Sequence, residues 1–204
     1  MAIVLDGSSS AGLLNLGTNG TISNLAVGGL PDGIVDTDMI AANAVTAAKR
    51  GAGAILQVIV VTKATSFGTT NTNHNGSHPL GDNIGGLTAD ITMTNASNKV
   101  LAMLSGSVSN SDTDYYSYFF LYRITSSAFT WLGSSVNKTR SGAHATDDLV
   151  INRLDTPGAG THTYQGRMAA EGNTAYLGQG QSMTSGANDD RIGDGNLILM
   201  EIAV

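Results

Sequence analysis

The chain of 204 residues contains no cysteine. This excludes a disulfide framework, a cysteine-ligated zinc site and thiol catalysis. Charged residues make up only 13% of the chain, about half of what globular domains usually carry. Sixteen acidic residues outnumber ten basic ones, and the net charge is -6. Nucleic acid is therefore not an expected partner, because phosphate binding requires a basic surface.

Long apolar runs are also missing. The longest, residues 52–61, is interrupted by Gly53 and Gln57 and is about half as long as a membrane span. Residues 1–6 have no positively charged start and too short an apolar run for a signal peptide. We therefore expect a soluble protein made in a cytoplasm, without membrane insertion.

A tandem motif occupies the first fifty residues. Residues 33–39 (GIVDTDM) return ten positions later as residues 43–49 (NAVTAAK), and no aromatic residue precedes Phe67. Such a stretch cannot bury enough apolar surface to offset its ordering entropy alone, whereas short repeats gain burial by stacking on neighbours or copies. The sequence predicts an assembling low-complexity arm over residues 1–50 with short β pieces. The alanine-rich residues 39–49 are compatible with one short helix.

A glycine pair at residues 51–53 is predicted to be a hinge, and the composition beyond it favours strands. Expected strands cover 55–65, 87–94, 99–109, 115–124, 128–132, 148–154, 161–170, 174–180 and 195–204. A polar loop is expected over residues 66–86. This spacing, without helical periodicity, predicts an all-β fold with an antiparallel sandwich or barrel head over residues 54–204.

Two of the expected strands are apolar on both faces. In 115–124 one face carries Tyr116, Tyr118, Phe120 and Tyr122, and in 195–204 both faces are apolar, with Leu197 and Leu199 on one of them. In a sheet with one solvent-exposed face, apolar and polar residues should alternate along each strand. These two strands do not alternate, so their second face must also be covered by protein. We expect sister copies of the chain to provide this cover, with these six residues at the interface. The alternative is a monomer whose central strands pack under its own long loops.

Three segments resemble the N-terminal regions of bacteriophage tail-fibre proteins: residues 1–7 (MAIVLDG), 14–22 (LNLGTNGTI) and 45–49 (VTAAK). The β region resembles the compact jelly-roll heads of the tumour-necrosis-factor-like type that phage fibres often carry. The resemblance implies a homotrimer, located in the virion, whose arm docks on another virion protein (baseplate, tail or capsid). Its expected docking residues are Leu13, Leu14, Leu16, Ile22, Leu25, Ile34, Val35, Met39 and Val45. The stem is very short for a fibre, so a head fibre, a capsid decoration protein or a baseplate protein without a receptor role stays open.

No catalytic motif accompanies these features. The sequence has no nucleophile elbow, phosphate-binding loop or dinucleotide-binding fingerprint, and its only glutamates are Glu171 and Glu201. His74 and His78 stand among Asn, Gly and Pro, which favours a solvated loop over a metal site. Asp112 with Asp114, and Asn188, Asp189 and Asp190 with Asp194, have oxygen atoms that suit calcium, but neither group matches the EF-hand pattern and turns explain both. We expect no enzyme activity, no cofactor and no bound metal.

Two sets of residues are candidates for contact with a host surface: residues of the loops at one end of the jelly roll, and a group of aromatic residues. In a jelly roll the loop after the first strand and the loop before the last lie at the end far from the arm, and such loops carry recognition. This placement suggests contact with a host surface glycan or protein through His74, Asn75, His78, Asp189, Asp190 and Arg191. Phe129, Trp131 and Tyr122 are able to form a sugar-stacking platform, but in a chain with one tryptophan a core role is favoured.

Overall fold

A computed structural model describes residues 50–75, 79–112, 114–125, 128–138, 147–178 and 195–204. The chain divides into two units, Met1–Ala44 and Val45–Val204, and all described residues belong to the second. Within these residues every regular element is a strand. The strands are β1 (Ile55–Lys63), β2 (Phe67–Thr69), β3 (Asp82–Met93), β4 (Lys99–Asn110), β5 (Tyr116–Thr125), β6 (Ala128–Lys138), β7 (Asp147–Asp155), β8 (Gly160–Ala170), β9 (Ala175–Leu177) and β10 (Gly195–Ile202).

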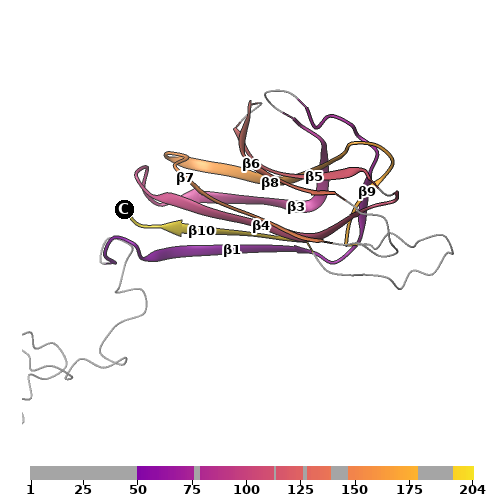
Figure 1. The fold of residues 1–204 in the computed structure, drawn as a ribbon. Coiled ribbons are helices and arrows are strands. Elements are labelled where there is room, and N and C mark those ends of the chain that lie inside the picture. Colours follow the sequence, from indigo (N-terminus) through magenta and orange to yellow (C-terminus); the bar gives the residue numbers. More distant parts are fainter. Residues whose placement is uncertain (1–49, 76–78, 113, 126–127, 139–146, 179–194) are drawn as a thin grey trace, which may run out of the picture. The chain divides into compact units, whose positions relative to one another are not determined.

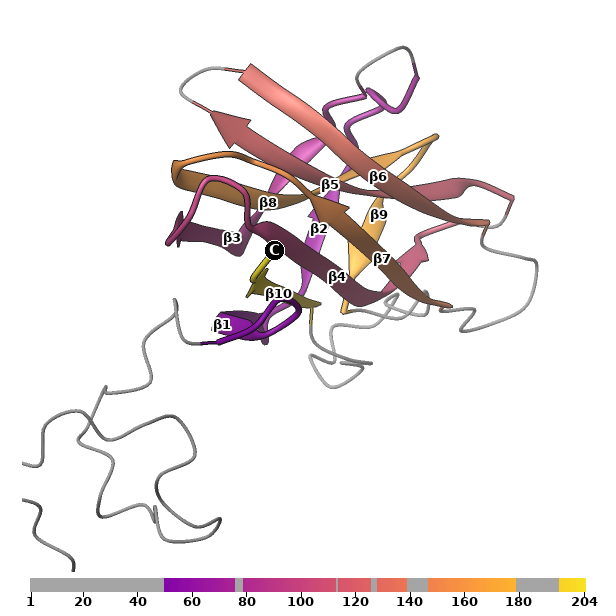
Figure 2. The same cartoon turned by 90° about the vertical axis from the view of Figure 1, so that its left-hand side faces the viewer.

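Two antiparallel sheets face each other and confirm the predicted jelly-roll class (Figures 1 and 2). The first sheet has the order β1-β10-β4, with β7 and then β9 pairing along the far side of β4 and β2 beyond β9. The second sheet has the order β3-β8-β5-β6. Because β1 pairs antiparallel with β10, the first and last strands of the sandwich lie side by side.

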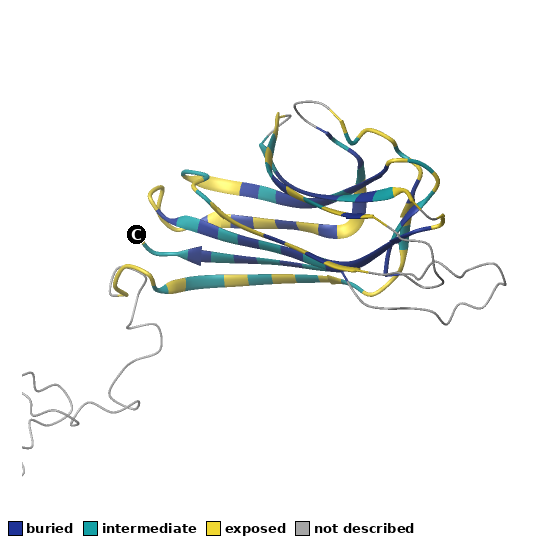
Figure 3. Cartoon of the chain, in the orientation of Figure 1, coloured by how far each residue is buried: buried dark blue, intermediate teal, exposed yellow. Residues whose placement is uncertain are grey.

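The core forms where the inner faces of the two sheets meet. Burial alternates along β10 and along most of β3, as expected for strands with one face against a core (Figure 3). The largest completely buried side chains of this core are Ile84, Leu87, Ile91, Leu104, Phe119, Leu121, Tyr164, Met168, Leu177 and Leu197. Each is worth roughly 1.5–3 kcal/mol when fully removed from water, so this layer stabilises the sandwich.

Most predicted strands coincide with observed ones, but two boundaries differ clearly and one short strand was not predicted. β3 begins at Asp82, inside the predicted loop. The sequence pattern misses this start because β3 is irregular there: Gly86 has a φ of +95° and the pairing with β8 shifts between Asn83 and Thr88. β6 continues to Lys138 instead of ending at 132, through a segment whose serines do not alternate with apolar residues. The short strand β2 within 66–86 was not predicted. Irregular pairing hides strands from a periodicity argument.

Several predicted sites lie outside the described residues. These are all nine docking residues of the arm, together with His78, Asp189, Asp190 and Arg191. Their roles stay predictions.

Candidate functional site

The outer face of the first sheet is apolar. The pairing of the strands places these side chains in rows across the sheet. One row runs from Val60 to Ile198 and then to Met103. The next runs from Val58 through Met200 and Leu101 to Leu154. Val150 pairs with Ser105 in the next row. We call this set the apolar sheet face; it consists of Val58, Val60, Leu101, Met103, Val150, Leu154, Ile198 and Met200.

The residues that the structure describes leave this face open to solvent. Val58, Val60, Val150 and Leu154 are 51–58% exposed and lie on the flanking strands β1 and β7. The four members on β4 and β10 are half-buried between them. Four strands spaced by about 4.8 Å and six residues of strand at about 3.4 Å give the face an area of roughly 400 Å². The largest apolar patch of a typical monomer measures about 300–600 Å² and is often functional, so this face is a candidate interaction site.

The structure corrects the expected interface residues of the last strand. Leu197 and Leu199 are completely buried in the sandwich core, so they are not available to a second copy. The residues of β10 that face outward are Ile198, Met200 and Ile202. Both faces of the strand are apolar, as the sequence showed, but the register puts the opposite set outside.

The aromatic face of β5 is covered within the chain. Residues 70–75 and 79–81, which we call the cover segment, supply side chains and carbonyls that contact Tyr118, Phe120 and Tyr122. The Tyr122 hydroxyl donates to the carbonyl of Pro79, and the His74 ring stacks on Tyr118 with centroids 4.4 Å apart. The expectation that Phe120 and Tyr122 await a sister copy is therefore wrong, and the alternative of cover by the chain's own loop holds for this strand. Tyr116 and Tyr118 are half-buried.

Hydrogen bonds tie the cover segment to the sheet. Arg167 on β8 donates from Nε to the carbonyl of Leu80 and from Nη2 to that of Gly81, the latter at 2.7 Å. Asp82 accepts from Thr69 and, at 2.7 Å, from Asn71. These two hydrogen bonds hold the pKa of Asp82 below its ordinary value, against the opposing effect of burial. Burial lowers the pKa of Arg167 and raises that of Tyr122.

Two of the tip candidates are described by the structure, and they differ. His74 is half-buried against Tyr118, so it belongs to the cover of the aromatic face. Asn75 is exposed. His74 and residues 79–81 therefore lie against the outer face of the second sheet, instead of projecting only beyond its end.

Trp131 lies on the surface, which contradicts the expected core role. It is 46% exposed and Phe129 is 37% exposed, while Tyr122 beneath them is completely buried. All three belong to the outer face of the second sheet, since Tyr122 pairs with Trp131 and Ile124 with Phe129. Of the three rings of the suggested platform, those of Tyr122 and Phe129 are in contact, with centroids 6.0 Å apart.

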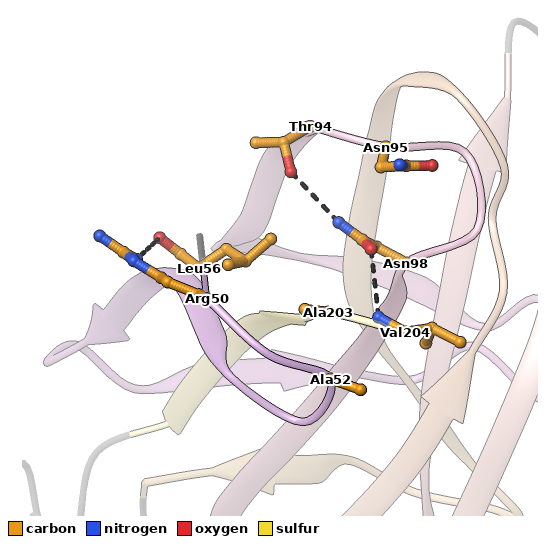
Figure 4. Close-up of a pocket in the computed structure, with 8 residues that line it drawn as sticks. All are labelled: Arg50, Ala52, Leu56, Thr94, Asn95, Asn98, Ala203 and Val204. Atoms are coloured by element: carbon orange, nitrogen blue, oxygen red, sulfur yellow. Dashed lines mark hydrogen bonds between the residues drawn. The ribbon is translucent and has the colours of Figure 1, made fainter. Parts of the chain in front are cut away.

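A hollow of about 370 Å³ lies at the end of the sandwich where residues 50–54 lead into β1 (Figure 4). Its lining comprises Arg50, Ala52, Leu56, Thr94, Asn95, Asn98, Ala203 and Val204. This lining contains amides, one hydroxyl and one guanidinium but no carboxylate or imidazole side chain. It therefore offers no general acid or base pair.

Beneath the hollow, Glu201 is completely buried without a cationic partner among the described residues. Its carboxylate accepts hydrogen bonds from Gln57, from Asn98 and from both the backbone and the hydroxyl of Thr94. Burial alone would raise the pKa of this group, but the hydrogen bonds outweigh it and lower the pKa below its ordinary value. Glu201 thus joins β1, the β3–β4 turn and β10, which is a structural role.

Among the described residues, other polar groups also serve the fold. Arg123 and Asp155 form a half-buried ion pair of 2.7 Å, and the hydroxyl of the completely buried Tyr164 donates to the same carboxylate at 2.7 Å. No group of three or more His, Asp or Glu residues in this part of the chain could hold a metal ion. The same residues contain no helix long and apolar enough to cross a membrane.

No protein-family model and no curated protein matches the chain. Among solved structures, it is similar to the infectious bursal disease virus VP2 subviral particle, with 10% identity and a TM-score of 0.36 over 72% of this chain and 38% of that one. It is also similar to the structure of the Gx strain of the same virus, with 13% identity and a TM-score of 0.33 over 72% of this chain and 37% of that one. The chain thus spans little more than a third of the length of these virus proteins.

Proposed function

We propose that this chain is a virion structural protein, a small phage fibre that assembles as a homotrimer and docks on the virion through residues 1–50. The single observation that carries the assembly is the apolar sheet face, which the described part of the chain leaves exposed. The resemblance of residues 1–7, 14–22 and 45–49 to the arms of phage fibre proteins supports the virion location. In this proposal the protein is not an enzyme, and its head contacts the host surface.

A second copy of the chain is the occupant that fits this face. A standard interface uses about 800 Å² of each partner, with an apolar centre and a polar rim. The apolar sheet face, at roughly 400 Å², is the size of such a centre. Polar residues border it, with Thr62 and Asn196 at one end and Lys99 at the other. It carries no net excess of charge, so it suits neither nucleic acid nor an oppositely charged partner.

Sedimentation of the full chain tests the assembly. We expect a species at three times the 20.9 kDa chain mass. The double variant Val60→Lys with Leu154→Lys, changed where both side chains are more than half exposed, should fold and sediment as a monomer. Val136→Lys is the matched control, because Val136 is 48% exposed on the other sheet and should leave the trimer intact. A monomeric wild type, or a double variant that stays trimeric, contradicts the proposal.

The fibre role is tested on the particle. Deleting residues 1–50 should leave a folded trimeric head that no longer attaches to virions. Electron microscopy with a label on the C-terminus should place the head outside the shell, and a label buried in the shell favours a capsid decoration or baseplate protein instead. Failure of the intact trimer to bind host cells would count against the receptor role only.

A further inference from the structure

We propose that Phe129 and Trp131 on β6 form a binding site for a neutral oligosaccharide, which lies across the outer face of the β3-β8-β5-β6 sheet. The proposal deepens the proposed function, since it names the class of host-surface molecule that the head meets. It depends on a different surface from the one used for assembly.

A β-bulge directs Trp131 outward. Leu121 pairs with Gly133 and Tyr122 with Trp131, so Leu132 is the extra residue of β6. Residues 131 and 133 of a regular strand would share one face. Here Gly133 faces inward, where an added Cβ would lie 3.1 Å from Ile151, and Trp131 faces outward. Bulges of this kind re-aim a side chain and are frequent beside functional sites.

The bulge is held in place from the opposite sheet. Arg153 on β7 donates from Nε to the carbonyl of Leu132 at 2.8 Å. The guanidinium occupies the space that the missing side chain of Gly133 leaves, since an added Cβ would be 2.9 Å from Nε. The position of Trp131 is therefore fixed by two features, a glycine and a hydrogen bond.

Phe129 is fixed as well. Its ring meets Tyr122 edge to face, with an interplanar angle of 86°, and the guanidinium of Arg167 lies 5.3 Å from its centroid. Arg167 is itself held by the carbonyls of Leu80 and Gly81 and by the Gln165 side chain. A rigid aromatic surface loses little entropy when it binds a ligand.

The polar groups of the same face continue the site across the sheet. Register places Phe129, Ile124, Thr163 and Asp90 in one row across the four strands. Thr163 donates to Asp90 at 2.6 Å, and Asp90 is exposed. The row spans about 14 Å from its aromatic end to its carboxylate end. This length requires several sugar units.

Carbohydrate is the ligand class that fits this combination. A sugar presents an apolar C–H face to an aromatic ring and hydroxyls to carboxylate and hydroxyl groups at its edge. Two exposed rings are too small a patch for the centre of a protein interface, and the carboxylate of Asp90 disfavours nucleic acid and acidic glycans. The cover segment shields Phe120 and Tyr122 but leaves Phe129 and Trp131 exposed.

The test uses the full chain and the fluorescence of Trp131, its only tryptophan. Maltohexaose, cellohexaose, mannohexaose and chitohexaose are titrated at millimolar concentration, and at least one should shift the emission and bind more tightly than its disaccharide. Phe129→Ala and Asp90→Ala should each weaken that binding several-fold. By calorimetry, Trp131→Ala should weaken it by roughly tenfold or more, and Trp131→Phe should restore most of it. Val136→Ala, on the same exposed face of β6, is the control and should bind normally.

Two results would overturn the proposal. One is the absence of binding by all four hexasaccharides. The other is dissociation of the trimer by Trp131→Ala, which would make the aromatic surface a contact between chains. Sedimentation of the same variants separates this failure from that of the proposed assembly, because loss of sugar binding with an intact trimer concerns the oligosaccharide site alone.

Discussion

Replacing the buried carboxylate of Glu201 by an amide of the same shape, Glu201→Gln, should destabilise the fold strongly. Oε1 accepts from the Thr94 amide and hydroxyl, both at 2.8 Å, and from Asn98 at 2.7 Å. Oε2 accepts from Gln57 at 2.6 Å. All four partners are donors, and a glutamine at this position has only one oxygen to offer them.

Reorientation of the neighbours cannot repair the change. If the amide oxygen of the new side chain takes the Oε1 position, its NH₂ group faces Nε2 of Gln57. Gln57 cannot turn its own oxygen toward that group, because the same Nε2 also donates to the carbonyl of Thr92 at 2.6 Å. The variant loses one charge-assisted hydrogen bond and weakens three more. We expect a loss of roughly 2–4 kcal/mol in the free energy of unfolding.

The loss should depend on pH. The folded state lowers the pKa of Glu201, so the unfolded chain takes up a proton before the folded one does. The stabilising contribution is therefore complete above the ordinary glutamate pKa of about 4.3 and disappears as the pH falls through the lower pKa of the folded state. Wild type and Glu201→Gln should differ fully at neutral pH and converge in acid below that range.

Urea unfolding of the full chain, at one fixed protein concentration because assembly affects apparent stability, measures both effects. Glu171→Gln is the matched control. Glu171 is the other glutamate of the chain, is exposed, and accepts one hydrogen bond of 3.2 Å from Tyr116, so its change should cost less than about 0.5 kcal/mol. An effect of Glu201→Gln as small as that of the control, or one that persists unchanged in acid, would refute the reasoning.

Three further substitutions test the other buried arrangements, each by urea unfolding. Gly81→Ala should lower the free energy of unfolding by about 2–4 kcal/mol, since Gly81 has a φ of +50° and an added Cβ would collide with the carbonyl oxygen of Met168. Gly85→Ala is its control, because an added Cβ there would meet no atom within 4 Å. Asp155→Asn should lower the free energy of unfolding by about 1–3 kcal/mol, because Arg123 loses its charged partner and the asparagine has one oxygen for the hydrogen bonds from Arg123 and Tyr164; a loss under about 0.5 kcal/mol would contradict that. Tyr122→Phe removes the hydroxyl that donates to Pro79 and should cost about 1 kcal/mol; no change in stability would show that the cover segment does not depend on this bond.

The strand pattern of the sequence predicts the sandwich but not which side of each strand faces the core. β10 is apolar on both faces, and only its pairing with β4 decides that Leu197 and Leu199 lie inside and Ile198 and Met200 outside. A period of two leaves these sets equivalent. The sequence therefore predicts that β10 is apolar on both faces, but not which of its apolar residues lie outside the core.

The cover of the aromatic face also escapes sequence reasoning. Residues 70–81 are rich in Asn, Thr and Gly, which predicts a solvated loop. Their contacts with the sheet depend largely on backbone carbonyls of Pro79, Leu80 and Gly81, which accept from Tyr122 and Arg167. Backbone acceptors are present at every residue and give no sequence signal. The same holds for the bulge at Leu132, whose only trace is the glycine that follows it.

The two outer faces of the sandwich differ in how far the described residues cover them, and this difference supports the proposed assembly. On the second sheet, a polar segment with a defined hydrogen-bond network covers the apolar side chains of β5. On the first sheet the described residues provide no such segment over eight apolar side chains, four of which are more than half exposed. A chain of low charge that hides one apolar face within itself gains solubility from doing so. In the proposed assembly, a copy of the same chain would cover the face that the described residues leave open.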